Sequence, residues 1–420
     1  MQLPTTAVPA FTAAFILAVA IALLLRLWLG LRQMHHVARH REAVPPMFAD
    51  RISPEAHRTA ADYTLAKTRL GLLDTVAGTL LLIALTLGGG LDTLARLLAG
   101  HFPPDSLLFG LGLFAGLGII GFVIDLPFGL YRTFVIEARF GFNKTTLALF
   151  LSDLAKQLLL TVLIGGPLLA AVLWLMARMG DAWWLWVWLF WLGFNLLAMV
   201  LYPTWIAPLF NTFKPLENDV LKVRIEALLN RCGFRSSGLF VMDGSRRSAH
   251  GNAYFTGFGA AKRIVFFDTL LERLDPPEIE AVLAHELGHF KCRHVWKRVG
   301  FLAILSLAFL WSLAQLIHQP WFYDGLGLSI PGTASALALF SLVLPVFTFP
   351  LAPLLSALSR HHEFEADDYA RQTSDGQDLA RALVKLYRDN AATLTPDPIH
   401  SAFYDSHPPA ALRLARLAPR

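Results

Sequence analysis

Seven stretches of this 420-residue chain are apolar enough, and long enough, to cross a lipid bilayer. The hydrocarbon core is about 30 Å thick, which a helix of about 20 apolar residues can span. Inside lipid, a helix satisfies its own backbone hydrogen bonds, so each stretch predicts a transmembrane helix. The stretches are residues 11–31, 70–90, 107–130, 157–176, 183–202, 300–318 and 334–357.

The composition agrees with a membrane protein that carries a polar part. Hydrophobic residues make up 55% of the chain and charged residues only 16%, whereas about a quarter of the residues in a soluble domain are charged. Two or three soluble domains, which the length alone would allow, are therefore excluded. The two cysteines, Cys232 and Cys292, cannot form a disulfide framework.

The basic residues of the loops predict the orientation. The loop of residues 32–69 is rich in Lys and Arg, whereas the loop of residues 319–333 has neither. Cytoplasmic loops carry an excess of basic residues, so we expect the N-terminus outside and residues 203–299 and 358–420 in the cytoplasm. The usage of Ala, Leu and Arg is typical of bacteria and favours a bacterial inner membrane.

This orientation divides the chain into four parts. A membrane region with five helices covers residues 1–202, and the sixth and seventh helices cover residues 300–357. Residues 203–299 and 358–420 are expected to build one polar domain together.

The chemistry is indicated by the sequence His285-Glu286-Leu287-Gly288-His289. On a helix, residues four apart share one face, so both imidazoles can bind one metal ion. This H-E-x-x-H pattern predicts one Zn²⁺ per chain, which polarises a carbonyl and activates water while Glu286 moves the proton.

The residues before this motif predict a small sheet followed by a capped helix. Residues 216–231 have helical spacing of apolar residues, and residues 238–242, 252–256 and 263–267 are typical of short strands. Asp275 as N-cap, Pro276 in the first turn and Glu278 three residues after the cap indicate where the zinc helix begins.

A hydrolytic zinc site needs a third protein ligand and one open position. We expect that ligand in the acidic segment 359–370, which follows the seventh apolar stretch on the same side of the membrane. Spacing alone leaves several candidates open, which are Glu363, Glu365, Asp367, His361 and His362.

Several separated motifs together resemble the type I CAAX prenyl endopeptidases, which are integral-membrane zinc metalloproteases. The resemblance extends over nearly the whole chain. It rests on residues 203–211 (PTWIAPLFN), 243–255 (DGSRRSAHGNAYF), 262–265 (KRIV), 268–271 (DTLL), the H-E-L-G-H helix, Glu363 to Asp367 (EFEAD), and 406–409 (SHPP) followed by Arg413.

The resemblance implies a fold and a set of roles. The fold is mainly α, with seven transmembrane helices around an intramembrane chamber and a cytoplasmic α+β zincin-like metalloprotease domain. His285, His289 and Glu363 are the implied zinc ligands, and Glu286 is the general base. Asp367 is implied to be an acid near the metal, and His407 is implied to face the oxyanion. The implied substrate strand contains Asn252, Ala253 and Tyr254. Arg413 is implied to hold the cluster by ion pairing or to contact substrate.

Two residues depart from the family pattern. Glu365 stands where eukaryotic relatives usually carry an amide, and His362 stands where an aromatic residue is common. We expect the extra charge of Glu365 at the helix surface, with neither residue at a ligand position.

The expected function is cleavage of peptide bonds in membrane-associated or lipidated, CAAX-like substrates. The expected partners are a peptide or protein substrate and membrane lipid, with no nucleic acid, and a monomer is plausible. One alternative is a quality-control protease that degrades misfolded or stalled membrane proteins. Another is a non-enzymatic multi-span transporter or receptor, which would need no third carboxylate and no strand before the zinc helix.

Overall fold

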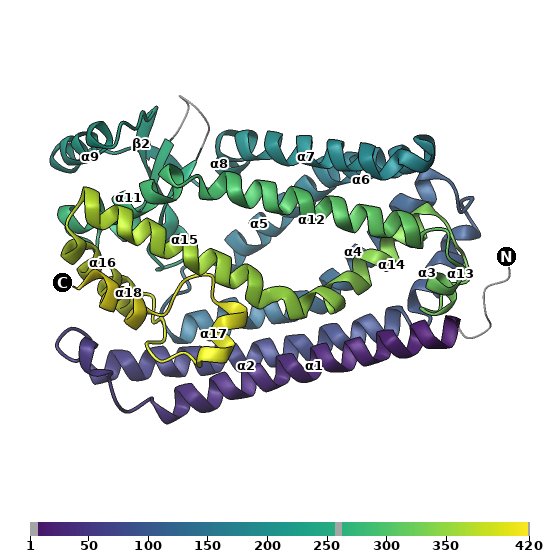
Figure 1. Ribbon diagram of the computed structural model, residues 1–420, viewed down its shortest axis with the longest axis horizontal. Helices are drawn as coiled ribbons and strands as arrows, with labels where there is room; N and C mark the ends of the chain where they lie inside the picture. Colours follow the sequence, from purple (N-terminus) through teal and green to yellow (C-terminus); the bar gives the residue numbers. More distant parts are fainter. Residues whose placement is uncertain (1–6, 257–262, 419–420) are drawn as a thin grey trace.

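Long helices dominate the computed structural model, which describes residues 7–256 and 263–418. Residues 1–6 and Lys262 of one quoted motif lie outside the described residues. The membrane helices lie along the long axis of the molecule, and the polar part (β1 to α11, with the end of α15 and α16 to α18) gathers at one end (Figure 1).

Seven segments of the described chain are long and apolar enough to span a membrane, which confirms the predicted number. Each segment overlaps one predicted stretch. Five contain it completely, whereas Pro54–Leu85 and His294–Leu316 end a few residues before the predicted ends at 90 and 318. They are Ala7–Arg39, Pro54–Leu85, Leu107–Glu137, Leu147–Arg178, Gly180–Phe210, His294–Leu316 and Thr333–Thr373.

The helices of the membrane part follow the chain in order. They are α1 (Ala7–Arg39), α2 (Pro54–Leu85), α3 (Gly90–Ala99), α4 (Leu107–Tyr131), α5 (Leu147–Leu160), α6 (Gly166–Arg178), α7 (Trp183–Leu201), α8 (Ala207–Phe210), α12 (His294–Leu316), α13 (Pro320–Asp324), α14 (Thr333–Thr348) and α15 (Ala352–Thr373). Three π-helical turns lie at Arg132–Glu137, Thr161–Gly165 and Tyr202–Ile206. Such turns locally widen a helix and are common at functional places.

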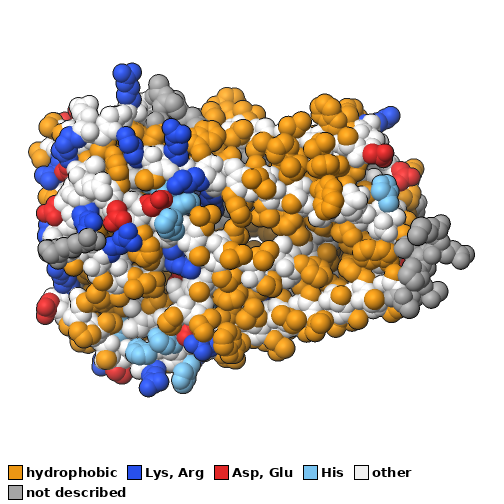
Figure 2. Space-filling model, viewed as in Figure 1, with side chains coloured by type: hydrophobic (Ala, Val, Ile, Leu, Met, Phe, Trp, Pro, Cys, Tyr) orange, Lys and Arg blue, Asp and Glu red, His pale blue; other side chains and the backbone are white. Residues whose placement is uncertain are grey.

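The spans bury few of their residues. Helix α5 has no buried residue, and α12 has only His294 and Leu313. A helix in a solid bundle buries a continuous stripe of side chains against its neighbours, so most of the surface of these two helices faces lipid or open space and not other helices. Hydrophobic side chains cover the membrane part in Figure 2, while most charged side chains gather at the end formed by the polar part.

The polar part is built on a four-stranded sheet with strand order β1-β2-β4-β3. Strand β4 (Arg263–Phe267) pairs in parallel with β2 (Gly238–Met242) and antiparallel with β3 (Ala253–Thr256). Three strands were predicted within a residue, whereas the short β1 (Phe213–Pro215) was not. Strand β3 is the last strand of the sheet, and its outer edge has no neighbour among the described residues.

Helices cover this sheet and enclose one apolar core. The core includes residues of α9 (Asp219–Arg231), α11 (Pro276–Lys291) and α16 (Gly376–Asp389). The remaining helices of the polar part are α10 (Asp268–Leu271), α17 (Pro398–Tyr404) and α18 (Ala410–Leu417). Helix α11 begins as predicted, because Asp275 and Glu278 form a reciprocal capping box with Pro276 in the first turn.

Helices α11 and α15 cross with almost no space between them. A Cβ atom built on Gly288 would lie 2.8 Å from the Cα and 3.0 Å from the carbonyl oxygen of Ala366. Only glycine permits so close an approach of two backbones. This contact brings the histidine face of α11 against the acidic face of α15.

Candidate metal centre

The close crossing of α11 and α15 brings His285, His289 and Glu363 together; we call these residues the first cluster. The Nε2 atoms of the two histidines are 3.2 Å apart. Glu363 Oε2 lies 3.4 Å from His285 Nε2, and Glu363 Oε1 lies 3.2 Å from His289 Nε2. Ligand atoms at about 2.0–2.2 Å from a tetrahedral Zn²⁺ are separated by about 3.3–3.5 Å. The first cluster therefore has the spacing of metal ligands.

Burial supports the same interpretation. Glu363 and His285 are 5% and 6% exposed, and Glu363 Oε2 is buried without a hydrogen-bond partner among the described residues. A buried carboxylate oxygen without a partner is costly. A cation between the three side chains would remove that cost, so the donor set fits a zinc ion.

His285 is held from behind by a buried ion pair. Its Nδ1 lies 2.8 Å from Oδ1 of Asp367, which is fully buried. Arg413 donates two hydrogen bonds to Asp367, at 2.6 and 2.9 Å. Burial alone would lower the pKa of His285, but the adjacent carboxylates of Asp367 and Glu363 outweigh burial and raise the pKa to about 9. Asp367 thus orients the imidazole, and its Nε2 faces the other ligand atoms.

His289 is held differently. Its Nδ1 lies 3.0 Å from Nδ1 of His294, the first residue of α12, and His294 Nε2 lies 2.7 Å from Oε2 of Glu365. His294, His362 and Glu365 form a second group of potential metal ligands, which we call the second cluster. Glu365 lies at the helix surface, with its side chain 35% exposed, and it also contacts the residue that supports His289.

Five of the remaining predicted site residues line a cavity of about 250 Å³, whereas Asp367 and Tyr254 do not. Glu286, beside the first metal ligand, lies on its wall together with His407 and Arg413. His407 Nε2 lies 3.5 Å from Glu363 Oε1, and its side chain is 62% exposed. Asn252 and Ala253 also line it. This cavity places a potential proton-transfer group and the end of the substrate strand on one side of the first cluster.

The outer edge of β3 has backbone groups available in a fixed pattern. The amide of Phe267 donates to the carbonyl of Asn252, so residues 252 and 254 direct their backbone groups toward β4. In an antiparallel ladder the intervening residues point the other way, so Ala253 and Phe255 face the open edge. Tyr254 packs its side chain near Met242 and Phe267. The structure therefore does not bring Tyr254 into the site, whereas it adds Phe255.

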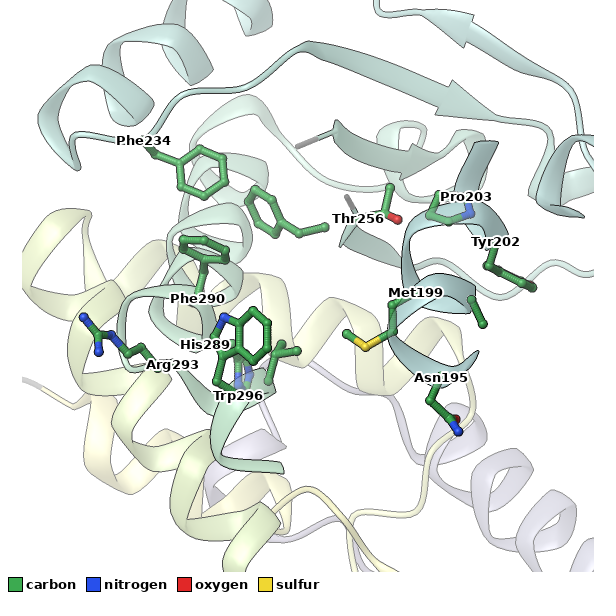
Figure 3. Close-up of a pocket in the computed structure, with 13 residues that line it drawn as sticks. Asn195, Met199, Tyr202, Pro203, Phe234, Thr256, His289, Phe290, Arg293 and Trp296 are labelled. Carbon is green, nitrogen blue, oxygen red and sulfur yellow. The ribbon is translucent and has the colours of Figure 1, made fainter. Parts of the chain in front are cut away.

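A second, more apolar cavity of about 450 Å³ adjoins the other metal-ligand histidine, His289. In Figure 3, Phe234, Phe290 and Trp296 lie on one side of it, and Met199, Tyr202 and Thr256 lie on the other. Its walls come from α7, β3, α11 and α12, so a membrane helix distant in the sequence meets the polar part here. Sequence reasoning did not find these residues, because each resembles an ordinary membrane or core side chain.

Comparison with known proteins agrees with this geometry. Residues 33–212 match the CAAX prenyl protease N-terminal region with five membrane helices, and residues 215–420 match peptidase family M48. A CAAX prenyl protease 1 homolog of Oryza sativa is 39% identical, with 76% of this chain and 75% of that protein covered. CAAX prenyl protease 1 of Saccharomyces cerevisiae is 36% identical, with 89% and 88% covered.

The chain belongs to the CAAX prenyl protease family. The crystal structure of S. mikatae Ste24p superimposes with a TM-score of 0.90 at 30% identity, with all of both chains covered. The predicted fold class is thereby confirmed: a mainly α, multi-pass membrane protein with an M48 protease part that contains a small sheet. The chain is a membrane metalloendopeptidase.

Proposed function

We propose that this membrane metalloprotease hydrolyses peptide bonds of membrane-associated, prenylated (CAAX-like) substrates with one Zn²⁺ held by His285, His289 and Glu363. The observation that carries the proposal is that the two Nε2 atoms lie 3.2 Å apart and that each lies 3.2–3.4 Å from one carboxylate oxygen of Glu363, beside an open strand edge. When bound, zinc would polarise a carbonyl group and lower the pKa of a water molecule toward 7.

The residues around the smaller cavity would perform the proton transfers. Glu286 takes a proton from the attacking water and passes it to the leaving amine, as a general base and then a general acid. His407 lies on the same wall and donates a hydrogen bond to the oxygen on which negative charge develops. Asp367 is fully buried behind His285, so it acts by orienting that imidazole.

The substrate would bind as an additional strand on β3. The carbonyl groups of Ala253 and Phe255 and the amide of Phe255 lie at the free edge and can pair with an extended peptide. The amide of Ala253 donates to Asn252 Oδ1 at 2.8 Å, so this hydrogen bond would open if a peptide paired with that amide. The side chain of Asn252 lies at one end of this strand, on the wall of the smaller cavity. Arg413 lines the same cavity, although its main contact is the ion pair with Asp367.

The apolar cavity would receive the prenyl group. It adjoins His289 and the Phe255–Thr256 end of β3, so a group attached next to the scissile bond can reach it. Its volume of about 450 Å³ falls in the usual range for ligand pockets, about 300–1,000 Å³. Two of its walls are membrane spans, so an isoprenoid would remain in apolar surroundings.

The proposed orientation places the polar part in the cytoplasm, with the N-terminus of the chain outside, in the inner membrane of a bacterium. The loop of residues 32–69 carries Arg32, Arg39, Arg41, Arg51, Arg58, Lys67 and Arg69, which supports that orientation. Labelling of single introduced cysteines in sealed vesicles checks it.

The test compares purified wild-type protein with Glu286→Gln on two peptides that differ only in a farnesyl group on cysteine. We expect the variant to retain zinc and lose cleavage, and the wild-type protein to prefer the farnesylated peptide. Full activity of Glu286→Gln would overturn the mechanism. If both peptides are cut equally, the prenylated substrate class is wrong; the quality-control alternative then predicts that unfolded membrane proteins accumulate on the inactive variant in cells.

A further inference from the structure

The second cluster lies directly behind a ligand of the first. We infer that His294 and Glu365 position His289 for metal binding, through a chain of two hydrogen bonds that connects three helices. His289 is on α11, His294 begins α12, and Glu365 is on α15. This inference rests on the zinc site proposed above and assigns a task to two residues outside it.

The direction of each hydrogen bond follows from the metal-facing atom. Nε2 of His289 faces the other ligand atoms, so its lone pair must be free and the proton of the neutral ring must lie on Nδ1. His294 Nδ1, at 3.0 Å, then accepts that proton and cannot carry one itself. The proton of His294 is therefore on Nε2, which donates to Glu365 Oε2 at 2.7 Å. Each atom in these two hydrogen bonds is therefore fixed as either a donor or an acceptor.

The three residues of the second cluster, His294, His362 and Glu365, are not arranged as ligands of a second metal. The distance of 2.7 Å between His294 Nε2 and Glu365 Oε2 is that of a charge-assisted hydrogen bond, and it is well below the spacing of about 3.3 Å expected for two zinc ligands. The rings of His294 and His362 are stacked, with centroids 4.1 Å apart and planes at 13°. Lone pairs in two nearly parallel ring planes do not converge on one ion.

The surrounding structure holds the hydrogen-bonded residues His294 and Glu365 in place. His294 is 5% exposed and is covered by the ring of His362. Glu365 is also paired with Lys297, one turn further along α12, at 3.5 Å. Arg293, the N-cap of α12, has a φ of 57°. A non-glycine residue in this left-handed region is strained and persists only where the surrounding structure holds it, and the next residue, His294, lies 3.0 Å from His289.

The experiment measures zinc affinity by competition with a chelator, in the purified full-length protein. We expect His294→Ala and Glu365→Ala to weaken zinc binding by about 10–100-fold, the usual effect of removing a partner of a metal ligand. The stoichiometry should remain one zinc per chain. Glu365→Gln should restore most of the affinity, because an amide oxygen also accepts the Nε2 proton.

A matched control is His361→Ala. His361 also lies near Glu365, at 3.7 Å, but its side chain is 69% exposed and outside the chain of hydrogen bonds. We expect its zinc affinity to equal that of the wild-type protein. In the Co²⁺-substituted protein, the visible ligand-field spectrum should change in Glu365→Ala and stay unchanged in His361→Ala.

Three results would overturn the inference. They are unchanged zinc affinity in Glu365→Ala, an equal loss in His361→Ala, or a fall from two metals per chain to one, which would identify a second metal site. If His294→Ala does not fold, the Glu365→Ala and Glu365→Gln pair still decides. A wild-type protein that binds no zinc would instead overturn the proposed function.

Discussion

The first and second clusters contain the same residue types, two histidines and one glutamate, yet their spacing differs. Atoms of the first cluster are 3.2–3.4 Å apart and leave one buried carboxylate oxygen without a hydrogen-bond partner among the described residues. The second cluster contains a hydrogen bond of 2.7 Å and a pair of stacked rings. Residue type therefore does not distinguish a metal site from its support; the distance between the polar atoms does.

Replacement of Glu363 should have the largest effect and should distinguish the first cluster from the second most clearly. We expect Glu363→Ala to lose both bound zinc and proteolysis, because two histidines alone leave a hydrolytic site without its third ligand. Metal analysis of the purified protein measures this loss. Glu365→Ala should keep one zinc per chain at saturating zinc, and equal zinc loss in both variants would show that the clusters are not distinct.

Replacement of Asp367 should show that the support of His285 differs from that of His289. Asp367 contacts His285 directly, whereas Glu365 acts on His289 through His294. Asp367→Asn removes the nearer of the two carboxylates that pair with buried Arg413, and leaves only the longer contact of 3.6 Å with Glu363. Breaking such a pair destabilises a protein by about 3–5 kcal/mol, so thermal unfolding should occur at a clearly lower temperature. Glu365 is partly exposed, and Glu365→Ala should lower zinc affinity with little change in unfolding temperature. A comparable fall in both variants would contradict this difference.

The pH dependence of zinc affinity should come from His285 of the first cluster. Its pKa is about 9, and zinc must displace the proton, so affinity should rise about tenfold per pH unit between pH 7 and 9 and then level off. In the metal-free protein the sign is opposite: the charged imidazole stabilises the fold below its unfolded pKa of about 6.5, and this contribution is lost as the pH rises through about 9. Chelator competition across this range measures the affinity, and a flat profile would contradict the prediction.

The smallest expected effect concerns the helix crossing that assembles the first cluster. Gly288→Ala places a methyl group 2.8 Å from the backbone of Ala366, and overpacking of this kind usually destabilises by about 1–3 kcal/mol. Zinc affinity should fall as well, because His285 and His289 move away from Glu363. Gly300→Ala on α12 is the control, since nothing lies within 4 Å of its added Cβ. Equal unfolding temperatures for the two variants would show that α11 and α15 can move apart at Gly288 without loss of stability.

Much of the fold could be predicted from local sequence. The seven spans are continuous apolar runs, and the start of α11 is determined by contacts among Asp275, Pro276 and Glu278, which are close in sequence. Strand β1 was missed because three residues, one of them proline, have no measurable periodicity. Likewise, the π-helical turns depend on how neighbouring helices pack, and no single residue type predicts them.

The site was only partly accessible from the sequence. The H-E-x-x-H spacing predicts two ligands on one helix face, but Glu363, Glu365 and Asp367 lie on one acidic helix and spacing did not choose among them. The choice depends on the rotation of α15 against α11, which the contact of Gly288 with Ala366 sets. The support by His294 depends on the backbone of Arg293, a tertiary feature without a sequence pattern.

Helix α15 is continuous in space with the seventh span, and it carries Glu363 only after the chain has crossed the membrane twice beyond α11. A ribosome therefore synthesises the two histidines long before it synthesises the residue that completes the metal site. Until the last span has entered the bilayer and turned back toward α11, the chain has no third ligand. With Glu363 as the third ligand, as proposed above, a partly synthesised copy would be unable to cleave peptides, so the order of membrane insertion would guard against premature proteolysis.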